Sequence, residues 1–407
     1  MKISFIACEY NPFHNGHKFH IDETRKHFNA PVCCVMSGNF VQRGEIALCE
    51  KHIRARSAIM NGADLVIELP IKYATSTASL FAEGFIKTAV ATGLKCNYSF
   101  GAEGDLSSLS EISDLIHSDD AEEFALLRSD RAMSYAEAKA QYISEYKGSD
   151  YSSFLKDSNN ILAIEYLHYI NKLSKGSDVF VLKREGVSHD SLFTSDSLAS
   201  ASFIRNRIYE LYDSCGNING LYEAARFIPE NVLFTLLEAY SAGRFPADKN
   251  KYSLAAFSVL SQLSKNELLK INSVNGGLEN RIYNKIRSCV NLSDLYDEIK
   301  TKRYPHSRIR QIINQAVLGI TREDINSGVN YIRVLAFNDN GREILHKMKD
   351  TACVPVIMNL SEIDKSDASS VRNAEIDFLA GKLMNLCSPQ PLNSNTEYSI
   401  PPVYIRN

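Results

Sequence analysis

Long hydrophobic runs are missing from this sequence of 407 residues. A membrane-spanning helix needs about 18 consecutive apolar residues, and no segment approaches that length. The apolar run at residues 3–8 is also shorter than the hydrophobic region of a signal peptide. We therefore expect a protein that neither spans a membrane nor is secreted, and we expect it in the cytoplasm.

A cysteine framework and a strong charge of one sign are missing as well. The nine cysteines are odd in number, scattered along the chain and free of any C-x-x-C pair, which is typical of reduced thiols. No spacing supports a structural zinc site, so we predict no metal held by the protein itself. The formal net charge of -3 disfavours a surface coated by nucleic acid but permits a local basic patch.

The sequence does contain a regular alternation of apolar runs and helical patterns. Hydrophobic residues make up 44% and charged residues 23%, the balance of a folded globular protein. Buried strands are predicted at 3–8, 31–36, 64–69, 97–100 and 178–183. Helices are predicted at 17–28, 47–61, 75–91, 160–173 and from 200 onward. Strands that alternate with helices indicate an α/β fold with a parallel sheet.

Two changes in composition divide the chain. Residues 101–157 carry 13 acidic side chains against five basic ones, which predicts a helical, acidic insertion at about 102–157. From about residue 228, long helical patterns dominate and few strand signals appear before 354–358. We therefore expect an α/β domain at 1–227 and a mainly α-helical C-terminal domain at 228–407.

His14, Asn15, Gly16 and His17 stand where the first predicted strand gives way to the first predicted helix. An open α/β sheet binds ligands beyond the ends of its strands. Two imidazoles can donate to phosphate oxygens, Gly16 permits close approach of the backbone, and the helix N-terminus adds unpaired N–H groups. This pattern predicts a polyphosphate site with His14 and His17 as its catalytic donors. The alternative is a turn with two solvated histidines.

A second serine-rich segment begins the helix predicted from residue 200. Ser200 and Ser202 resemble a capping pair, and Arg205 follows within the first helical turn. Hydroxyl and N–H groups at a helix start would hold further phosphate oxygens, with Arg205 as a charged clamp. An ordinary serine cap beside a surface arginine is the alternative interpretation.

The segment 281–310 is the local basic patch, with five more positive than negative charges. It also contains Tyr304 and His306, and cations beside a stackable ring are what an RNA-binding face requires. A solvated helix face is the alternative. The candidate RNA-binding side chains are Arg281, Lys285, Arg287, Lys302, Arg303, Arg308 and Arg310.

These segments together resemble one enzyme family. The segments EYNPFHNGH at 9–17, MSGNFVQRGE at 36–45, GADLVIELP at 62–70, SFGAE at 99–103, NNIL at 159–162 and SAS at 200–202 look like the bacterial tRNA(Met) cytidine acetate ligase family of the nucleotidylyl transferase superfamily. GLENRI at 277–282 and TKRY at 301–304 extend the resemblance into the second half. The resemblance implies a Rossmann-like nucleotidyltransferase domain followed by a tRNA-binding helical domain.

The resemblance also implies an activity. That family activates acetate with ATP to acetyl-adenylate and pyrophosphate, and then transfers the acetyl group to the wobble cytidine of elongator tRNA(Met), forming N(4)-acetylcytidine. The implied partners are therefore ATP, acetate and this tRNA, with Mg²⁺ accompanying ATP and no protein partner. The implied ATP-binding residues are Ala7, Cys8, Glu9, Tyr10, Asn11, Pro12, Phe13, His14, Asn15, Gly16, His17, Lys18, Phe19, His20, Gly101, Asn159, Asn160, Arg184, Ser200 and Ser202. Either Asn159 or Asn160 is the contact within its pair.

The chemistry of such a reaction suggests a place for the second substrate. Gln42, Arg43 and Glu45 follow the second predicted strand and form a candidate pocket for the acyl group and the base. Their alternative is a polar surface loop. Two other functions stay open at this point: an adenylyltransferase that makes a dinucleotide cofactor, and a non-catalytic RNA-binding protein that senses ATP.

Overall fold

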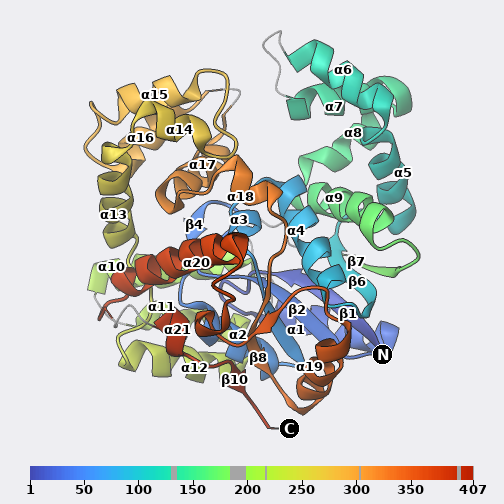
Figure 1. Cartoon of the computed structure of the whole chain (residues 1–407), viewed down its shortest axis with the longest axis vertical. Coiled ribbons are helices and arrows are strands. Elements are labelled where there is room, and N and C mark those ends of the chain that lie inside the picture. Colours follow the sequence, from blue (N-terminus) through green and yellow to red (C-terminus); the bar gives the residue numbers. More distant parts are fainter. Residues whose placement is uncertain (130–134, 184–198, 216–217, 302–303, 392–395, 407) are drawn as a thin grey trace.

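The computed structural model describes residues 1–129, 135–183, 199–215, 218–301, 304–391 and 396–406, and Figure 1 shows helices packed around one main sheet. The strands are β1 Lys2–Cys8, β2 Val32–Ser37, β3 Phe40–Val41, β4 Glu45–Ile46, β5 Leu65–Leu69, β6 Lys95–Ala102, β7 Asp178–Lys183, β8 Ile332–Phe337, β9 Val356–Ile357 and β10 Val403–Tyr404. The helices up to residue 215 are α1 Asn15–Phe28, α2 Lys51–Ile59, α3 Ile71–Ala74, α4 Ala78–Ala91, α5 Leu106–Ile116, α6 Asp119–Ser129, α7 Tyr135–Lys147, α8 Ser149–Ser153, α9 Ser158–Leu173 and α10 Ala201–Cys215. Those that follow are α11 Asn219–Ala224, α12 Glu230–Ser241, α13 Lys249–Gln262, α14 Lys265–Lys270, α15 Leu278–Lys285, α16 Leu292–Ile299, α17 His306–Leu318, α18 Arg322–Asn326, α19 Asp339–Thr351, α20 Ala368–Cys387 and α21 Thr396–Ser399.

The main sheet has the order β10-β8-β5-β2-β1-β6-β7, and β9 pairs with β8. The pairs β5·β2, β2·β1, β1·β6 and β6·β7 are all parallel, so their carboxyl ends lie at one edge of the sheet. The pair β5·β8 is antiparallel. The predicted α/β fold with a mostly parallel sheet is therefore confirmed. Three strands from the second half of the chain, β8 and its parallel partners β9 and β10, extend the sheet in the opposite direction.

The inner strands are mostly apolar because both faces of the sheet are covered. Phe5 and Cys33 belong to one core cluster, whereas their chain neighbours Ile6 and Cys34 belong to another on the opposite face. Successive side chains of a strand point to opposite faces, so a strand buried on both sides shows no polar alternation. This explains why the sequence showed short continuous apolar runs.

The predicted strands are all present, and several helix boundaries differ. The first helix begins at Asn15 rather than at residue 17, and α2 begins at Lys51 rather than at 47, because the hairpin β3–β4 and its connection occupy the preceding residues. The helix expected from 75 begins at Ala78, after the short α3. Pro70 precedes α3, and Thr77 caps α4 by accepting a hydrogen bond from the Leu80 N–H.

The acidic insertion is helical, as predicted, and consists of α5 to α8. In Figure 1 it rises above the sheet on one side, and α14, α15 and α16 rise on the other. The second half is mainly helical, but it also contains the strand β8, which was not predicted and lies well before the signal at 354–358. The domain boundary at residue 228 stays a prediction, and β8 shows that the sheet takes a strand from beyond it. No helix in the described part of the chain is long and apolar enough to cross a membrane.

Candidate active site

The His-x-Gly-His segment lies at the carboxyl end of β1 and forms the start of α1. His14 is the N-cap residue of α1, and its Nδ1 accepts a hydrogen bond from the Gly16 N–H at 3.1 Å. The Nδ1 atom of His17 in turn accepts the His14 N–H at 3.2 Å, which completes a reciprocal cap. The two rings stack with their centroids 3.6 Å apart. The predicted pair is therefore held side by side at a helix N-terminus.

These two caps fix where the ring protons lie. A neutral imidazole that accepts at Nδ1 carries its hydrogen on Nε2. In their neutral form His14 and His17 therefore carry their hydrogens on Nε2, and the helix dipole adds a positive potential at the same place. Such a constellation stabilises negative charge that develops on phosphate oxygens.

The implied ATP-binding segment 7–20 is called the first loop below. Some of its remaining side chains are buried in the protein, and others lie near the surface. Tyr10 and Phe13 are buried and pack edge to face, so contact with a ligand would come from their backbone. His20 hydrogen-bonds through Nε2 to Ser99 Oγ at 2.8 Å, which ties α1 to β6. Lys18 pairs with Asp22 on the exposed side of α1, and Phe19 is exposed.

The serine-rich segment meets the first loop in space. Ser200 caps α10 by accepting the Phe203 N–H at 3.1 Å. Arg205 donates to the Asn11 carbonyl at 2.7 Å and to Ser202 Oγ at 3.1 Å. The structure therefore brings the two predicted phosphate elements together, and Arg205 bridges them.

Asn159 and Asn160 belong to the first turn of α9. They contact the turn that follows Gly101 at the end of β6. The Asn160 Oδ1 accepts the N–H groups of Glu103 and Gly104, each at 3.0 Å. Asn159 donates from Nδ2 to the Glu103 carboxylate at 2.7 Å. Both asparagines thus hold the turn after β6, and which of them contacts ATP stays a prediction. Arg184 lies outside the described residues.

The candidate substrate pocket is the turn between β3 and β4. The Gln42 N–H donates to Glu9 Oε1 at 2.7 Å, which joins the turn to the first loop. Arg43 donates to Ser158 Oγ at 3.4 Å, at the start of α9. Gly44 has φ +77°, and a Cβ there would lie 2.5 Å from the backbone of Arg310. This turn is therefore packed against α17 and is not a free surface loop.

A buried arginine that the sequence does not single out organises the site. Arg54 of α2 is 1% exposed and donates to the carbonyl oxygens of Glu9, Ser37 and Gly38. It thereby joins the loop after β1 to the loop after β2. Burial lowers the pKa of Arg54. No sequence signal distinguishes this arginine from a surface residue of a helix, because its partners are backbone groups far away in the chain.

A buried cluster of charged side chains has one member, Lys51, on the same helix, α2, as Arg54. Lys51 is ion-paired with Glu68 and Glu397, each at 2.8 Å, and Arg333 of β8 also pairs with Glu397. All four side chains are 5% exposed or less. Gly38 packs so closely on Glu68 that a Cβ would lie 2.2 Å from its Oε1. The cluster therefore connects β5, β8, α2 and the C-terminal segment.

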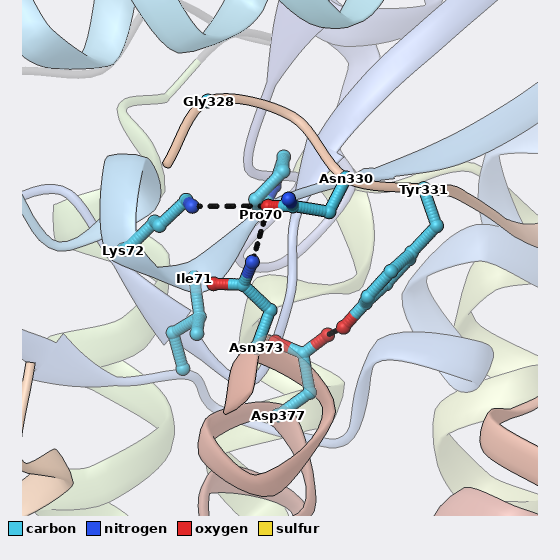
Figure 2. A pocket seen from close by; sticks show the side chains of 8 residues that line it. All are labelled: Pro70, Ile71, Lys72, Gly328, Asn330, Tyr331, Asn373 and Asp377. Carbon is cyan, nitrogen blue, oxygen red and sulfur yellow. Dashed lines mark hydrogen bonds between the residues drawn. The ribbon is translucent and has the colours of Figure 1, made fainter. Parts of the chain in front are cut away.

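A small pocket adjoins this cluster at the end of β5. Figure 2 shows Lys72 and Asn373 pointing toward Asn330, and Tyr331 pointing toward Asp377. Its volume of about 10 Å³ is the size of one water molecule, so neither ATP nor a nucleoside fits. Burial lowers the pKa of Lys72 to about 8, and burial together with Glu68 raises the pKa of Asp377 to about 7. No metal-binding group of three or more His, Cys, Asp or Glu side chains occurs among the residues described.

The predicted RNA-binding residues do not form one uniform face. Arg281 donates to the Glu298 and Lys300 carbonyls at the end of α16, and Lys285 pairs with Glu298 at 2.5 Å. Arg287 is exposed and lies over the Tyr283 ring, with its Cζ 3.6 Å from the centroid.

The other members of this set lie elsewhere. Arg308 donates to Gln311 Oε1 at 3.4 Å, and Arg310 donates to the Arg43 carbonyl at 3.3 Å, which places both beside the pocket turn. Lys302 and Arg303 lie outside the described residues. The basic segment therefore begins near α15, where Arg287 is exposed, and reaches the candidate pocket turn at Arg310.

The strand order and the His-x-Gly-His loop at the first helix define a nucleotidyl transferase. A family model described as HIGH Nucleotidyl Transferase matches residues 1–399. Relatives named tRNA(Met) cytidine acetate ligase include that of Caldanaerobacter subterraneus subsp. tengcongensis, 36% identical over 94% of both chains, and that of Clostridium perfringens, 32% identical over 100% of both. The chain belongs to the tRNA(Met) cytidine acetate ligase family. The resemblance found in the sequence is thereby confirmed.

Two solved structures of Thermotoga maritima TmcAL are similar to this chain over its whole length. Both are 28% identical in sequence and cover 100% of both chains. The apo structure has a TM-score of 0.91, and the structure bound with alpha-thio ATP has a TM-score of 0.89. The likeness therefore includes the helical lobes as well as the sheet.

Proposed function

We propose that this protein is a ligase that joins acetate to the wobble cytidine of elongator tRNA(Met) at the expense of ATP, with AMP and pyrophosphate as products. The observation that carries the proposal is the pair of Nε2–H donors of His14 and His17 at the N-terminus of α1, in a chain that belongs to this ligase family. Donors of this kind suit the phosphates of a nucleoside triphosphate, and the family name supplies the acceptor.

The proposed reaction has two steps. The acetate carboxylate attacks the α-phosphorus of ATP, pyrophosphate leaves, and acetyl-adenylate forms. His14, His17 and the first N–H groups of α1 stabilise the charge that accumulates on the phosphate oxygens. The wobble cytidine amine then attacks the acetyl carbonyl, and AMP leaves. A cytosine amine is a weak nucleophile, so it needs an activated acyl donor.

The finer assignments belong to the same proposal. ATP binds between the first loop, the turn after β6 and the start of α10, with Mg²⁺ held chiefly by its phosphates. Acetate and the cytosine enter at Gln42, Arg43 and Glu45, next to Glu9. The tRNA contacts the helical lobe of α14 to α17, no protein partner is required, and the protein acts in the cytoplasm.

Incubation of the protein with ATP, acetate and tRNA(Met), followed by mass spectrometry of the nucleosides, tests the proposal. We expect N(4)-acetylcytidine only when all three substrates are present. Pyrophosphate release that does not depend on acetate would instead favour an adenylyltransferase that makes a dinucleotide cofactor. ATP binding without any pyrophosphate release would favour a non-catalytic RNA-binding protein that senses ATP.

The helical lobe makes a prediction about salt. Arg287→Glu should weaken tRNA binding and reduce the slope of log affinity against log salt by about 0.7 to 0.9 for each phosphate that the protein no longer neutralises. The guanidinium of Arg287 donates to the carbonyl and the hydroxyl of Tyr283, and it is exposed on the surface where a phosphate or a base can approach it. Arg342→Glu, an exposed position on α19, is the matched control and should leave the slope unchanged. Equal slopes in both variants would contradict an RNA-binding role for this arginine. ATP affinity should stay the same throughout.

A further inference from the structure

The second step of the proposed reaction requires a base. When the cytidine amine attacks the acetyl carbonyl, the nitrogen becomes cationic and must lose a proton before the amide is formed. The two histidines do not meet this need, because each Nδ1 accepts a backbone N–H and each Nε2 therefore carries a hydrogen. A carboxylate within reach of both the adenylate and the cytosine is the natural candidate.

Glu9 lies where the loop proposed to bind ATP meets the candidate pocket turn. It is the first residue after β1 and therefore belongs to the loop that ends at His14 and His17. Its Oε1 accepts the Gln42 N–H at 2.7 Å, which sets the carboxylate against the candidate pocket turn. Its carbonyl oxygen accepts a hydrogen bond from Arg54 of α2 at 2.5 Å, which holds the backbone of Glu9 in place.

The second oxygen of this carboxylate is available. Glu9 Oε2 accepts no hydrogen bond from any residue that the structure describes, and it is not among the enclosed polar atoms that lack a partner. Other carboxylates nearby are less suitable. The Oε2 of Glu103 is enclosed, while its Oε1 accepts from Asn159. Glu68 is buried in an ion pair with Lys51.

The charges around Glu9 come from four packed elements. Arg43 of the turn, Arg54 of α2 and Arg205 of α10 favour the carboxylate, and Tyr166 of α9 lies close enough to interact with it. Burial nevertheless outweighs the Gln42 N–H and the three arginines, and it raises the pKa of Glu9 above its usual value. A carboxylate with a raised pKa is a stronger proton acceptor than an exposed one.

We propose that Glu9 is the general base of the acetyl-transfer step, a role that rests on the proposed function. The cytidine N4 forms its bond to the acetyl carbon, the carbon–oxygen bond of the mixed anhydride breaks, and AMP leaves with that electron pair. The proton lost from N4 passes to Glu9 Oε2. The adenylation step needs no such base, because acetate is already an anion.

Measuring the two steps separately tests this role. The first step is followed by acetate-dependent exchange of pyrophosphate into ATP without tRNA, and the second by single-turnover transfer from preformed acetyl-adenylate to tRNA(Met). Glu9→Gln keeps an acceptor for the Gln42 N–H but takes up no proton. We expect transfer to fall at least about a hundredfold and exchange to fall much less. Glu9→Asp should restore part of the transfer rate.

The pH profile provides a second test that needs no variant. In the parent protein the transfer rate should fall as the pH drops through the raised pKa of Glu9, while the exchange rate should not follow that titration. Transfer by Glu9→Gln should lose this acidic limb. Glu238→Gln, at an exposed position on α12 paired with Arg56, controls for the loss of a negative charge and should behave as the parent.

Several outcomes would overturn the role of Glu9. Exchange and transfer that fall by the same factor would make Glu9 a structural link between the loops. Transfer that is impaired by Glu45→Gln and not by Glu9→Gln would move the base to the neighbouring side chain. Absence of acetate-dependent exchange in the parent protein would instead refute the proposed function, which is a separate result.

Discussion

Replacing His14 by asparagine is expected to slow acetyl-adenylate formation about a hundredfold while leaving the protein folded. A preorganised donor that faces developing phosphate charge contributes about 3 kcal/mol to the transition state, which corresponds to that factor. His14 also caps α1 through Nδ1. Asparagine caps helices well, so His14→Asn removes the Nε2–H donor while a side-chain acceptor stays at the helix start. Pyrophosphate exchange and thermal unfolding together measure the two effects.

The comparison with alanine separates catalysis from capping. His14→Ala should lose about the same rate and, in addition, about 1 kcal/mol of stability, because the cap is lost as well. His17→Ala should lose a similar rate, since its Nε2–H is the second donor. His27→Asn, in the last turn of the same helix and stacked on Phe180, serves as the histidine control and should keep the parent rate. Near-parental exchange in His14→Asn would rule out the proposed phosphate contact.

The α/β part of the fold could be predicted from the sequence because its signals are local. A parallel strand that is buried on both faces has a short, continuous apolar sequence. Cys33 and Cys34 are an example, because these neighbours in β2 face opposite core clusters. The His-x-Gly-His loop was found for the same reason: the strand, the loop and the helix that hold it are consecutive. Ser200 and Ser202 were found as a helix start, and the structure brings them to the first loop through Arg205.

Residues that depend on distant partners could not be predicted in this way. Arg333 places a positive charge within the apolar run of β8. Its burial in the sheet is explained by its ion pair with Glu397, which is distant in the sequence. Arg54 is buried where four carbonyl groups from three separate segments accept its hydrogen bonds. The number of basic residues at 281–310 predicted a single RNA-binding face. A residue count, however, does not show in which direction each side chain points. Arg310 consequently points to the pocket turn while Arg287 stays exposed.

The buried charge cluster leads to the largest expected loss of stability. Glu397→Ala should lower the free energy of unfolding by about 3 to 5 kcal/mol, because Lys51 and Arg333 would then face Glu68 with one positive charge unbalanced in the interior. Chemical denaturation at pH 7 measures this difference. Glu375→Ala is the matched control, since Glu375 pairs with Arg372 at the surface, and it should cost less than about 1 kcal/mol.

Two further measurements distinguish charge balance from simple loss of packing. Adding Lys51→Met to Glu397→Ala removes the excess cation and should recover part of the loss, whereas a packing defect would make the two changes add. The pH dependence gives the second measurement. Burial alone would raise the pKa of Glu397, but Lys51 and Arg333 outweigh it and hold that pKa at about 2, below the unfolded value of 4.5. Its contribution to stability is therefore full above about pH 4.5 and is lost as the pH falls toward 2, so the parent should lose stability in this window faster than Glu397→Ala. Parallel pH curves for the two proteins would show that the carboxylate is not held by these cations.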